Sequence, residues 1–177
     1  MQQQASTANR ALIAQFRPRV IVRRIDLIRN DSHSVGQHGE NMFTIESWTI
    51  ELLFVNTGGT GASVHNGFME AGWREVPERH RYERLHLAPI DSFSLKPGEE
   101  KSVTVLISER GKFGSKVDFL RLKAKDRGFA GHRLQAVGLI CYTDESGISR
   151  KTGFSRDLDI EAMKFVASKD PEEEYED

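Results

Sequence analysis

Short runs of alternating apolar and polar residues recur along most of this chain. The clearest run spans 44–56, and one face of the strand it predicts carries Trp48, Ile50, Leu52 and Phe54. The opposite face also becomes apolar toward the end of the run, at Leu53 and Val55. A strand that is apolar on both faces is typical of the interior of a sheet. We therefore expect residues 44–56 to form a central strand.

A second run with the same character spans 134–142. One face carries Leu134, Ala136, Gly138, Ile140 and Tyr142. The other face carries Val137, Leu139 and Cys141, so this strand is also predicted to be central. Asp144-Glu-Ser-Gly147 reverses the chain, and 148–158 returns as a more polar partner strand.

The remaining strand predictions are bounded by turn-forming residues. They cover 19–29, 62–68, 81–87 and 103–107. In 19–29, Ile21, Ile25 and Leu27 share one parity, whereas Val20 and Val22 have the other. Because arginines fill the opposite side, we expect an edge strand with one buried face. Pro97-Gly98 occupies the two corners of a type II turn, in which Gly98 supplies the positive φ.

Three segments have helical character. Residues 2–15 are good helix formers, and 160–168 predicts a short terminal helix. Residues 109–131 fit two patterns: Val117, Leu120 and Ala124 have helical spacing, while Leu120, Leu122 and Ala124 have strand spacing. The pattern does not decide between them.

Together these segments predict an all-β protein, with about seven to nine strands in an antiparallel β-sandwich. We expect a helical lead-in at 1–18, the sandwich at 19–158, and a short helix with an acidic disordered tail at 159–177. The last nine residues contain six acids and one lysine, and like charges repel.

Two turns resemble those of a known group of proteins. A strand ends in Phe54-Val-Asn-Thr-Gly-Gly-Thr-Gly-Ala62, and Phe93-Ser-Leu-Lys-Pro-Gly-Glu99 precedes the Val103-Thr-Val105 strand. This arrangement resembles bacterial immunoglobulin-like modules of the cell-adhesion-related and fibronectin type III-like kinds, over about residues 19–158. The resemblance implies an immunoglobulin-like sandwich, to which the helical segments predicted above add short terminal appendages. It also implies a spacer, adhesion or assembly role, with no catalytic residues to carry over.

Charge is balanced overall but not along the chain. The 177 residues contain 25 Lys and Arg against 26 Asp and Glu, a net charge of -1. This balance provides no general attraction for nucleic acid or an anionic membrane. Residues 1–29, however, contain six arginines and one acid.

The candidate binding residues in this basic region are Arg19, Arg23, Arg24 and Arg29. They would suit an acidic protein partner, self-association or, behind an upstream membrane segment, an anionic lipid surface. The alternative is that charge on an edge strand only prevents aggregation. No nucleic acid is expected, because no aromatic residues are interleaved for base stacking.

A second class of function is a small-ligand or carbohydrate-binding module. Trp73, Tyr82 and Phe68 would form its stacking surface, against the alternative that these rings belong to the core.

No pattern predicts an enzyme, a cofactor or a metal site. Cys141 is the single cysteine, so no internal disulfide forms, and its position within an apolar strand favours an inert, buried thiol. The six histidines lack the spacing of a zinc site. The amino terminus lacks a secretory signal, which favours the cytoplasm, or a membrane-anchored location if the chain is a fragment. We therefore expect a non-catalytic interaction or assembly module.

Overall fold

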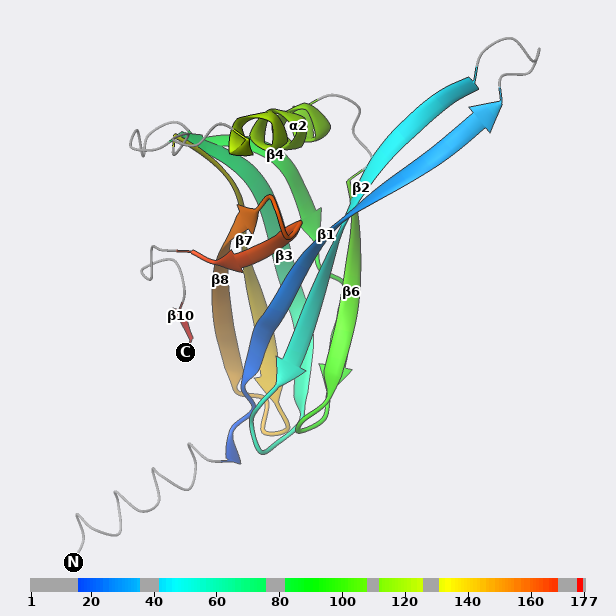
Figure 1. Ribbon diagram of the computed structural model, residues 1–177. Coiled ribbons are helices and arrows are strands. Elements are labelled where there is room, and N and C mark those ends of the chain that lie inside the picture. The colour runs from blue at the N-terminus through cyan, green and yellow to red at the C-terminus, as the bar shows by residue number, and fades with distance from the viewer. Residues whose placement is uncertain are drawn as a thin grey trace, which may run out of the picture.

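The computed structural model describes residues 16–35, 42–75, 82–107, 112–125, 131–168 and 175–176. This part of the chain is mostly antiparallel β-structure with one helix, as expected for an all-β protein (Figure 1). The strands are β1 (Val20–Val35), β2 (Met42–Asn56), β3 (Ala62–Glu75), β4 (Tyr82–Pro89), β5 (Phe93–Leu95), β6 (Glu100–Ile107), β7 (His132–Asp144), β8 (Ser149–Asp159), β9 (Lys164–Ala167) and β10 (Tyr175–Glu176). The helix is α2 (Lys112–Ala124), between β6 and β7 in the chain.

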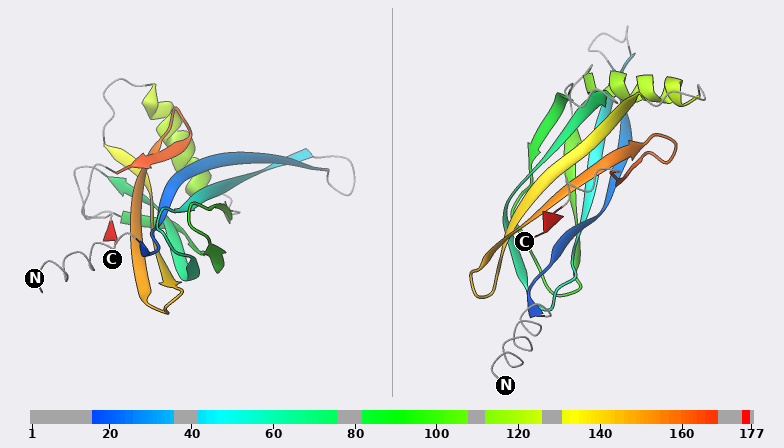
Figure 2. Two further views of the ribbon diagram at one scale, coloured as in Figure 1. Left: turned by 90° about the horizontal axis from the view of Figure 1, so that it is seen from below. Right: turned by 90° about the vertical axis from the view of Figure 1, so that its left-hand side faces the viewer.

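The strands form one curled sheet in the order β4-β3-β7-β8-β9-β1-β2-β6, with β5 paired to β3 and β10 paired to β8. The sheet wraps around the core, and α2 lies across one end of the strands (Figure 2). We call β4, β3, β7 and β8 the β3 half, and β1, β2 and β6 the β1 half. Beyond β6, the far ends of β1 and β2 project from the body as a two-stranded ribbon (Figures 1 and 2).

The two strands predicted to be central are central. β2 lies between β1 and β6, and β7 lies between β3 and β8. Their predicted inner faces are buried, and these faces carry Trp48, Ile50, Leu52, Phe54, Leu134, Ala136, Ile140 and Tyr142. Burial on this scale is what drives the two halves together, because each large apolar side chain removed from water contributes about 2 kcal/mol.

The prediction of an edge strand at 19–29 is wrong. β1 pairs with β2 along its whole length and with β9 at Ile25 and Asp26. It therefore lies inside the strand order, and the two ends of the sheet are β4 and β6. Sequence could not show this, because β9 reaches β1 from the far end of the chain.

A β-bulge explains the mixed parity of β1. The register with β2 passes from Val22↔Phe54 to Arg24↔Leu53, which leaves Arg23 as an extra residue. The buried side chains on either side of this bulge are Val20, Val22, Ile25 and Leu27. The two parities seen in the sequence therefore belong to one face.

The ambiguous segment 109–131 contains a helix. α2 places Phe113, Val117 and Leu120 in the core, at the spacing of one helical face. The ring of Phe113 packs edge-on against Trp48, with centroids 6.2 Å apart. The strand alternative is excluded for 112–124, since Leu122 points into solvent.

The helix predicted at 160–168 is wrong. The side-chain oxygen of Asp159 accepts hydrogen bonds from the backbone N–H groups of Glu161 and Ala162, which forms a turn. Met163 then adopts a φ of 52°, which is incompatible with a right-handed helix. The chain continues as β9, which pairs with both β8 and β1.

Other predictions for the two ends of the chain lie outside the described residues. These are the helix at 2–15 and most of the acidic tail. Within the tail, β10 is described and pairs with β8, so that Tyr175 lies opposite Gly153.

Both predicted turns are confirmed. Gly98 has a φ of 74°, and the N–H of Glu99 donates to the carbonyl of Lys96 at 3.0 Å, closing the turn. In the β7–β8 hairpin, Gly147 has a φ of 78° and its N–H donates to the carbonyl of Asp144.

One side chain links the turn that follows β2 to the start of β1 and the end of β5. Asn56, at the end of β2, is completely buried. Its Oδ1 accepts hydrogen bonds from the N–H groups of Arg19 and Gly58, at 3.1 and 3.0 Å. Its Nδ2 donates to the carbonyls of Thr60 and Leu95, at 2.7 and 3.3 Å. A carboxamide offers two acceptor sites and two donors, so this set uses its whole capacity.

We predict that Asn56→Ala lowers the free energy of unfolding by about 2 to 4 kcal/mol, because it leaves buried backbone groups without partners. Urea denaturation would measure the loss. Asn66→Ala is the matched control, since Asn66 is exposed on β3, and it should change the value by less than about 0.5 kcal/mol. Equal stability of the two variants would contradict the role of the carboxamide.

Candidate functional site

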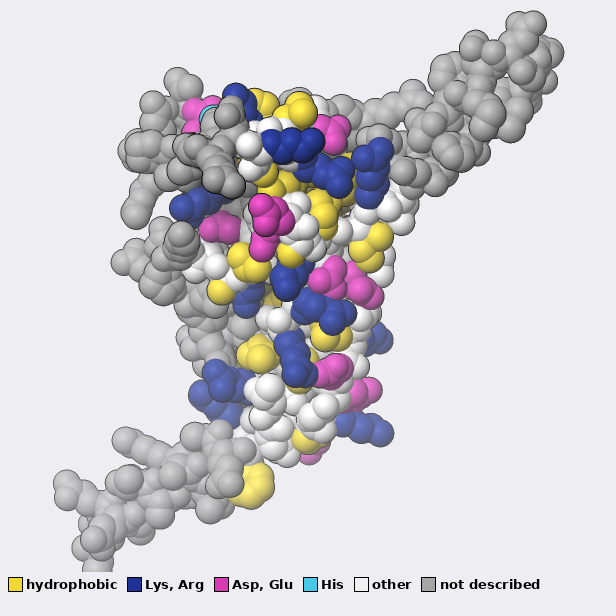
Figure 3. All heavy atoms as spheres, in the orientation of Figure 1, with side chains coloured by type: hydrophobic (Ala, Val, Ile, Leu, Met, Phe, Trp, Pro, Cys, Tyr) yellow, Lys and Arg dark blue, Asp and Glu magenta, His cyan; other side chains and the backbone are white. Residues whose placement is uncertain are grey.

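The arginines expected to form a basic surface are interspersed with acids. Arg23 pairs with Glu100 of β6, and Arg24 pairs with Asp26 on its own strand. Figure 3 shows cationic and anionic side chains mixed on the face that carries β1 and β9. Exposed ion pairs of this kind add little stability. The acidic partners do, however, interrupt the positive charge that the arginines would otherwise present.

The other two arginines lie apart from this pair. The guanidinium of Arg29 lies over the ring of Trp48, 5.9 Å from its centroid. The side chain of Arg19 is exposed at the start of β1, where its backbone N–H bonds to Asn56. The structure therefore does not gather the four predicted residues into one site.

The three aromatic residues of the predicted stacking surface are divided between two faces. Trp73 is in the core, where its ring packs edge-on against Phe119 at 5.7 Å. Lys116 lies over the same ring, with its Nζ 4.7 Å from the centroid. For Trp73 the core alternative is correct. Phe68 and Tyr82, by contrast, are partly exposed on the opposite face of the sheet.

A second bulge decides which of these residues faces the core. The register between β3 and β7 passes from Val64↔Tyr142 to Asn66↔Cys141, so His65 is the extra residue. Before the bulge, Val64 faces the core; after it, Phe68 lies on the outer face, by which we mean the face of the β3 half turned away from the core.

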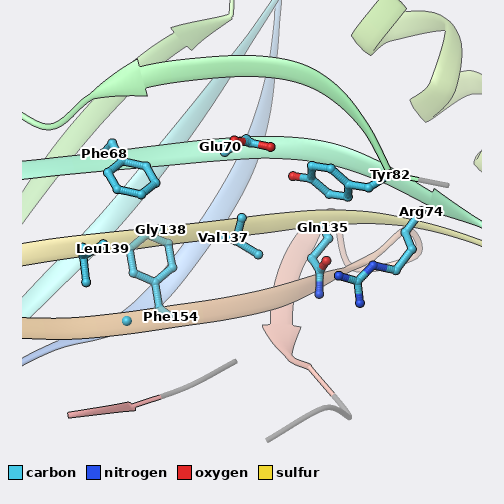
Figure 4. A pocket seen from close by; sticks show the side chains of 10 residues that line it. Phe68, Glu70, Arg74, Tyr82, Gln135, Val137, Gly138, Leu139 and Phe154 are labelled. Atoms are coloured by element: carbon cyan, nitrogen blue, oxygen red, sulfur yellow. The ribbon is translucent and has the colours of Figure 1, made fainter. Parts of the chain in front are cut away.

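A hollow of about 430 Å³ lies on this outer face (Figure 4). It extends over β3, β7 and β8, with Tyr82 of β4 at one side. Its lining comprises Phe68, Glu70, Arg74, Tyr82, Gln135, Val137, Gly138, Leu139, Gly153 and Phe154. Cavities that hold small ligands usually measure about 300 to 1,000 Å³.

A second hollow, of about 510 Å³, lies on the other side of β3. It is bounded by Arg84, Leu87 and Pro89 of β4 and shares Phe68 and Glu70 with the first. The outer face therefore has two concave regions on either side of one ridge. Side chains on the solvent face of an antiparallel sheet are usually polar, so two hollows with apolar lining on this face are a distinctive feature.

Glu70, on the shared ridge, is the main electrostatic feature of this face. It is only 7% exposed, and its Oε2 lies 2.7 Å from Nε of Arg84. The hydroxyl of Tyr82 points toward the carboxylate (Figure 4). Burial, and then the hydrogen bond to Glu70, raise the pKa of Tyr82 above its ordinary value. The tyrosine therefore remains a neutral donor.

Glycines provide the space for two aromatic rings, one on each face of the β3 half. On the outer face, a Cβ added to Gly72 would lie 2.1 Å from Cζ of Tyr82, so that ring packs directly on the backbone of β3. On the core face, a Cβ on Gly138 would lie 2.2 Å from Cζ of Phe154, a core residue whose ring packs on the backbone of β7. Pairs of this kind, an aromatic residue beside a cross-strand glycine, stabilise twisted sheets.

Polar side chains close the end of the hollow opposite Phe68. Gln135 is buried, and its Nε2 donates to the hydroxyl of Ser155 at 2.9 Å. Beside it, Nη1 of Arg133 donates to Oδ2 of Asp157 at 3.1 Å. These contacts hold the side chains of β7 and β8 in fixed positions, as a preformed binding site requires.

Of this set, sequence reasoning identified only Phe68 and Tyr82. The residues it missed are Glu70, Arg74, Arg84 and Gln135. Alternation places residues 68, 70, 72 and 74 on one face, but only the bulge at His65 makes that face the outer one.

Within the described residues, no three His, Cys, Asp or Glu side chains come together as a metal site. In the same part of the chain, no helix has the length and apolar character needed to cross a bilayer. The prediction that Cys141 is buried is wrong: it is a free thiol of intermediate exposure on the outer face of β7, because its alternate neighbours Ile140 and Tyr142 take the core face.

We predict that Tyr82 makes the fold sensitive to alkaline pH. An unfolded tyrosine loses its proton near pH 10, whereas folded Tyr82 keeps it, so the folded state binds more protons above that pH. The free energy of unfolding should therefore fall as the pH rises above about 10. Urea denaturation at about pH 8 and pH 11 would measure the decline, and Tyr82→Phe should reduce it. An identical decline in the variant would contradict this prediction.

Comparisons with known proteins leave the family of this chain open. No protein-family model matches it, and no curated protein matches it. Two solved structures are similar to it. One is a Bordetella pertussis protein provisionally named ApaA, with 14% identity, a TM-score of 0.33, and coverage of 76% of this chain and 95% of that one. The other is Spo0M, a sporulation control protein from Bacillus subtilis, with 15% identity, a TM-score of 0.31, and coverage of 75% and 47%. These similarities are too low to assign the chain to a family.

Proposed function

We propose that this chain is a non-catalytic, immunoglobulin-like β-sandwich that acts as a protein interaction module. Two features support the sandwich: the core between the two halves of the sheet, and the Asn56 and Pro97-Gly98 turns, which resemble those of bacterial immunoglobulin-like modules. The non-catalytic role is consistent with the way Glu70, Arg84 and Tyr82 engage one another.

The observation that carries the proposal is the apolar hollow between β3 and β4. Phe68 is 43% exposed and Leu87 is 51% exposed, and together with Pro89 they line a concave surface. Protein interfaces concentrate their binding energy where an apolar anchor enters such a pocket. The neighbouring ion pair of Arg84 and Glu70 supplies a polar rim.

The partner we propose therefore presents a large apolar side chain, such as leucine or phenylalanine, to this hollow. The basic residues Arg23 and Arg24 do not carry the proposal, because acids of the same chain pair with them. Membrane tethering through an upstream segment remains a prediction from the sequence alone.

A carbohydrate-binding surface is less well supported. A flat stacking platform needs its rings on one face, and Trp73 lies on the core side of β3. The hollow beside Tyr82 nevertheless has the size of a small-ligand site.

We predict that a photo-crosslinking amino acid at Leu87 captures a specific protein in cells of the source organism. The same amino acid at Leu122 is the matched control, because that leucine is 69% exposed on α2, away from the hollow. Mass spectrometry would identify products specific to position 87. The product should then bind the purified chain, and Leu87→Asp should weaken that binding by about tenfold or more. Equal capture at both positions would remove this surface from the proposal.

A further inference from the structure

The hollow over β3, β7 and β8 has two chemically different ends (Figure 4). Phe68, Leu139 and the ring of Phe154 lie at one end, with Val137 between them and the other end. The other end is formed by Tyr82, Gln135 and Arg74. A ligand that fills the hollow would therefore have an apolar body and a polar head.

The apolar end has room because Gly153 of β8, which lies opposite Leu139, has no side chain. Val137 and Leu139 are half-buried on the same face. An aromatic or branched aliphatic group fits this surface, since apolar contact is nondirectional and proportional to the area removed from water.

The charge at the polar end favours an anion over a cation. The carboxylate of Glu70 is already engaged by Nε of Arg84 at 2.7 Å and by the hydroxyl of Tyr82. A cationic head would have to compete with that guanidinium. The guanidinium of Arg74 lies over the Tyr82 ring, 6.0 Å from its centroid, and its five N–H groups form a planar fork that suits a carboxylate.

Two polar side chains that line the hollow are more than nine-tenths buried. Glu70 is 7% exposed and Gln135 is 2% exposed. The hydrogen bond from Gln135 to Ser155 and the ion pair of Glu70 with Arg84 hold both in place before any ligand arrives. A site organised in advance loses less conformational entropy on binding.

From these observations we propose that the hollow binds a small carboxylic acid with an aromatic or branched apolar body. The carboxylate lies at Arg74 and the apolar body lies over Val137 and Leu139, beside Phe68. This site adjoins the partner contact proposed at Leu87, which lies across β3 in the other hollow and shares Phe68 and Glu70 with it.

Nuclear magnetic resonance titration of the full ¹⁵N-labelled chain tests the proposal. The probe is phenylacetate, compared with phenylacetamide and phenethylamine, which keep the ring and change the head group. We expect saturable shifts of the amides of 137–139 and 153 with phenylacetate. The amide and the amine should bind about tenfold more weakly or worse, because each loses the charge-assisted contact with Arg74. Equal binding of the three probes, shifts elsewhere on the chain, or no saturable shift would overturn the proposal.

Variants test the contacts of the ligand's carboxylate and those of its apolar body separately. Arg74→Gln should weaken phenylacetate about tenfold and leave phenylacetamide unchanged. Arg121→Gln, on the exposed side of α2, removes the same charge and should change neither. Val137→Phe should fill the hollow and abolish binding, whereas Val137→Thr, of similar size, should retain it. The amide spectrum of each variant verifies folding. Retained binding of phenylacetate in Val137→Phe would contradict the proposed location. Leu87→Asp should still bind phenylacetate, so this test does not depend on whether a protein partner exists.

Discussion

The carboxamide of Asn56 determines how the chain passes from one half of the sheet to the other. It bonds to Arg19 at the entry to β1, to the turn that follows β2, and to Leu95 at the end of β5. β5 pairs with β3, so one buried side chain joins both halves at one end of the molecule. The close approach of Gly58 to the backbone of Arg17, where a Cβ would lie 2.1 Å from the carbonyl oxygen, permits this geometry. A fully satisfied buried amide specifies one arrangement, because any displacement would leave donors or acceptors unpaired.

The opposite junction, between β8 and β1, is built differently. β9 spans only part of it, and two β8 side chains complete the contact. Thr152 donates from Oγ1 to the carbonyl of Val20 at 2.8 Å, and Arg156 donates from Nη2 to the carbonyl of Val22 at 3.3 Å. Burial lowers the pKa of Arg156, and these carbonyl contacts partly compensate for the lost hydration. Side chains thus satisfy carbonyls that would otherwise need a neighbouring strand.

The outer face of the β3 half carries the surface on which both proposals depend. The bulge at His65 turns Phe68 and Glu70 outward, and Gly72 lets the ring of Tyr82 lie against the backbone. The result is two hollows on either side of β3, one beside Leu87 and one beside Arg74. Recognition by this module would therefore depend on a sheet face, which is more rigid than a loop.

Local pattern alone determined the central strands, the Gly98 and Gly147 turns and the all-β class, because these follow from alternation and backbone conformation over a few residues. It could not place the bulges at Arg23 and His65, since a bulge is defined by the partner strand. It therefore could not show that Trp73 faces the core while Phe68 and Tyr82 face outward. The helix at 112–124 depended on contacts with Trp48 and Trp73, and residues 164–167 became a strand because β8 and β1 offered partners on both sides. Secondary structure that depends only on a few neighbouring residues could thus be predicted from the sequence. The proposed binding surface was decided by pairing between segments far apart in the chain.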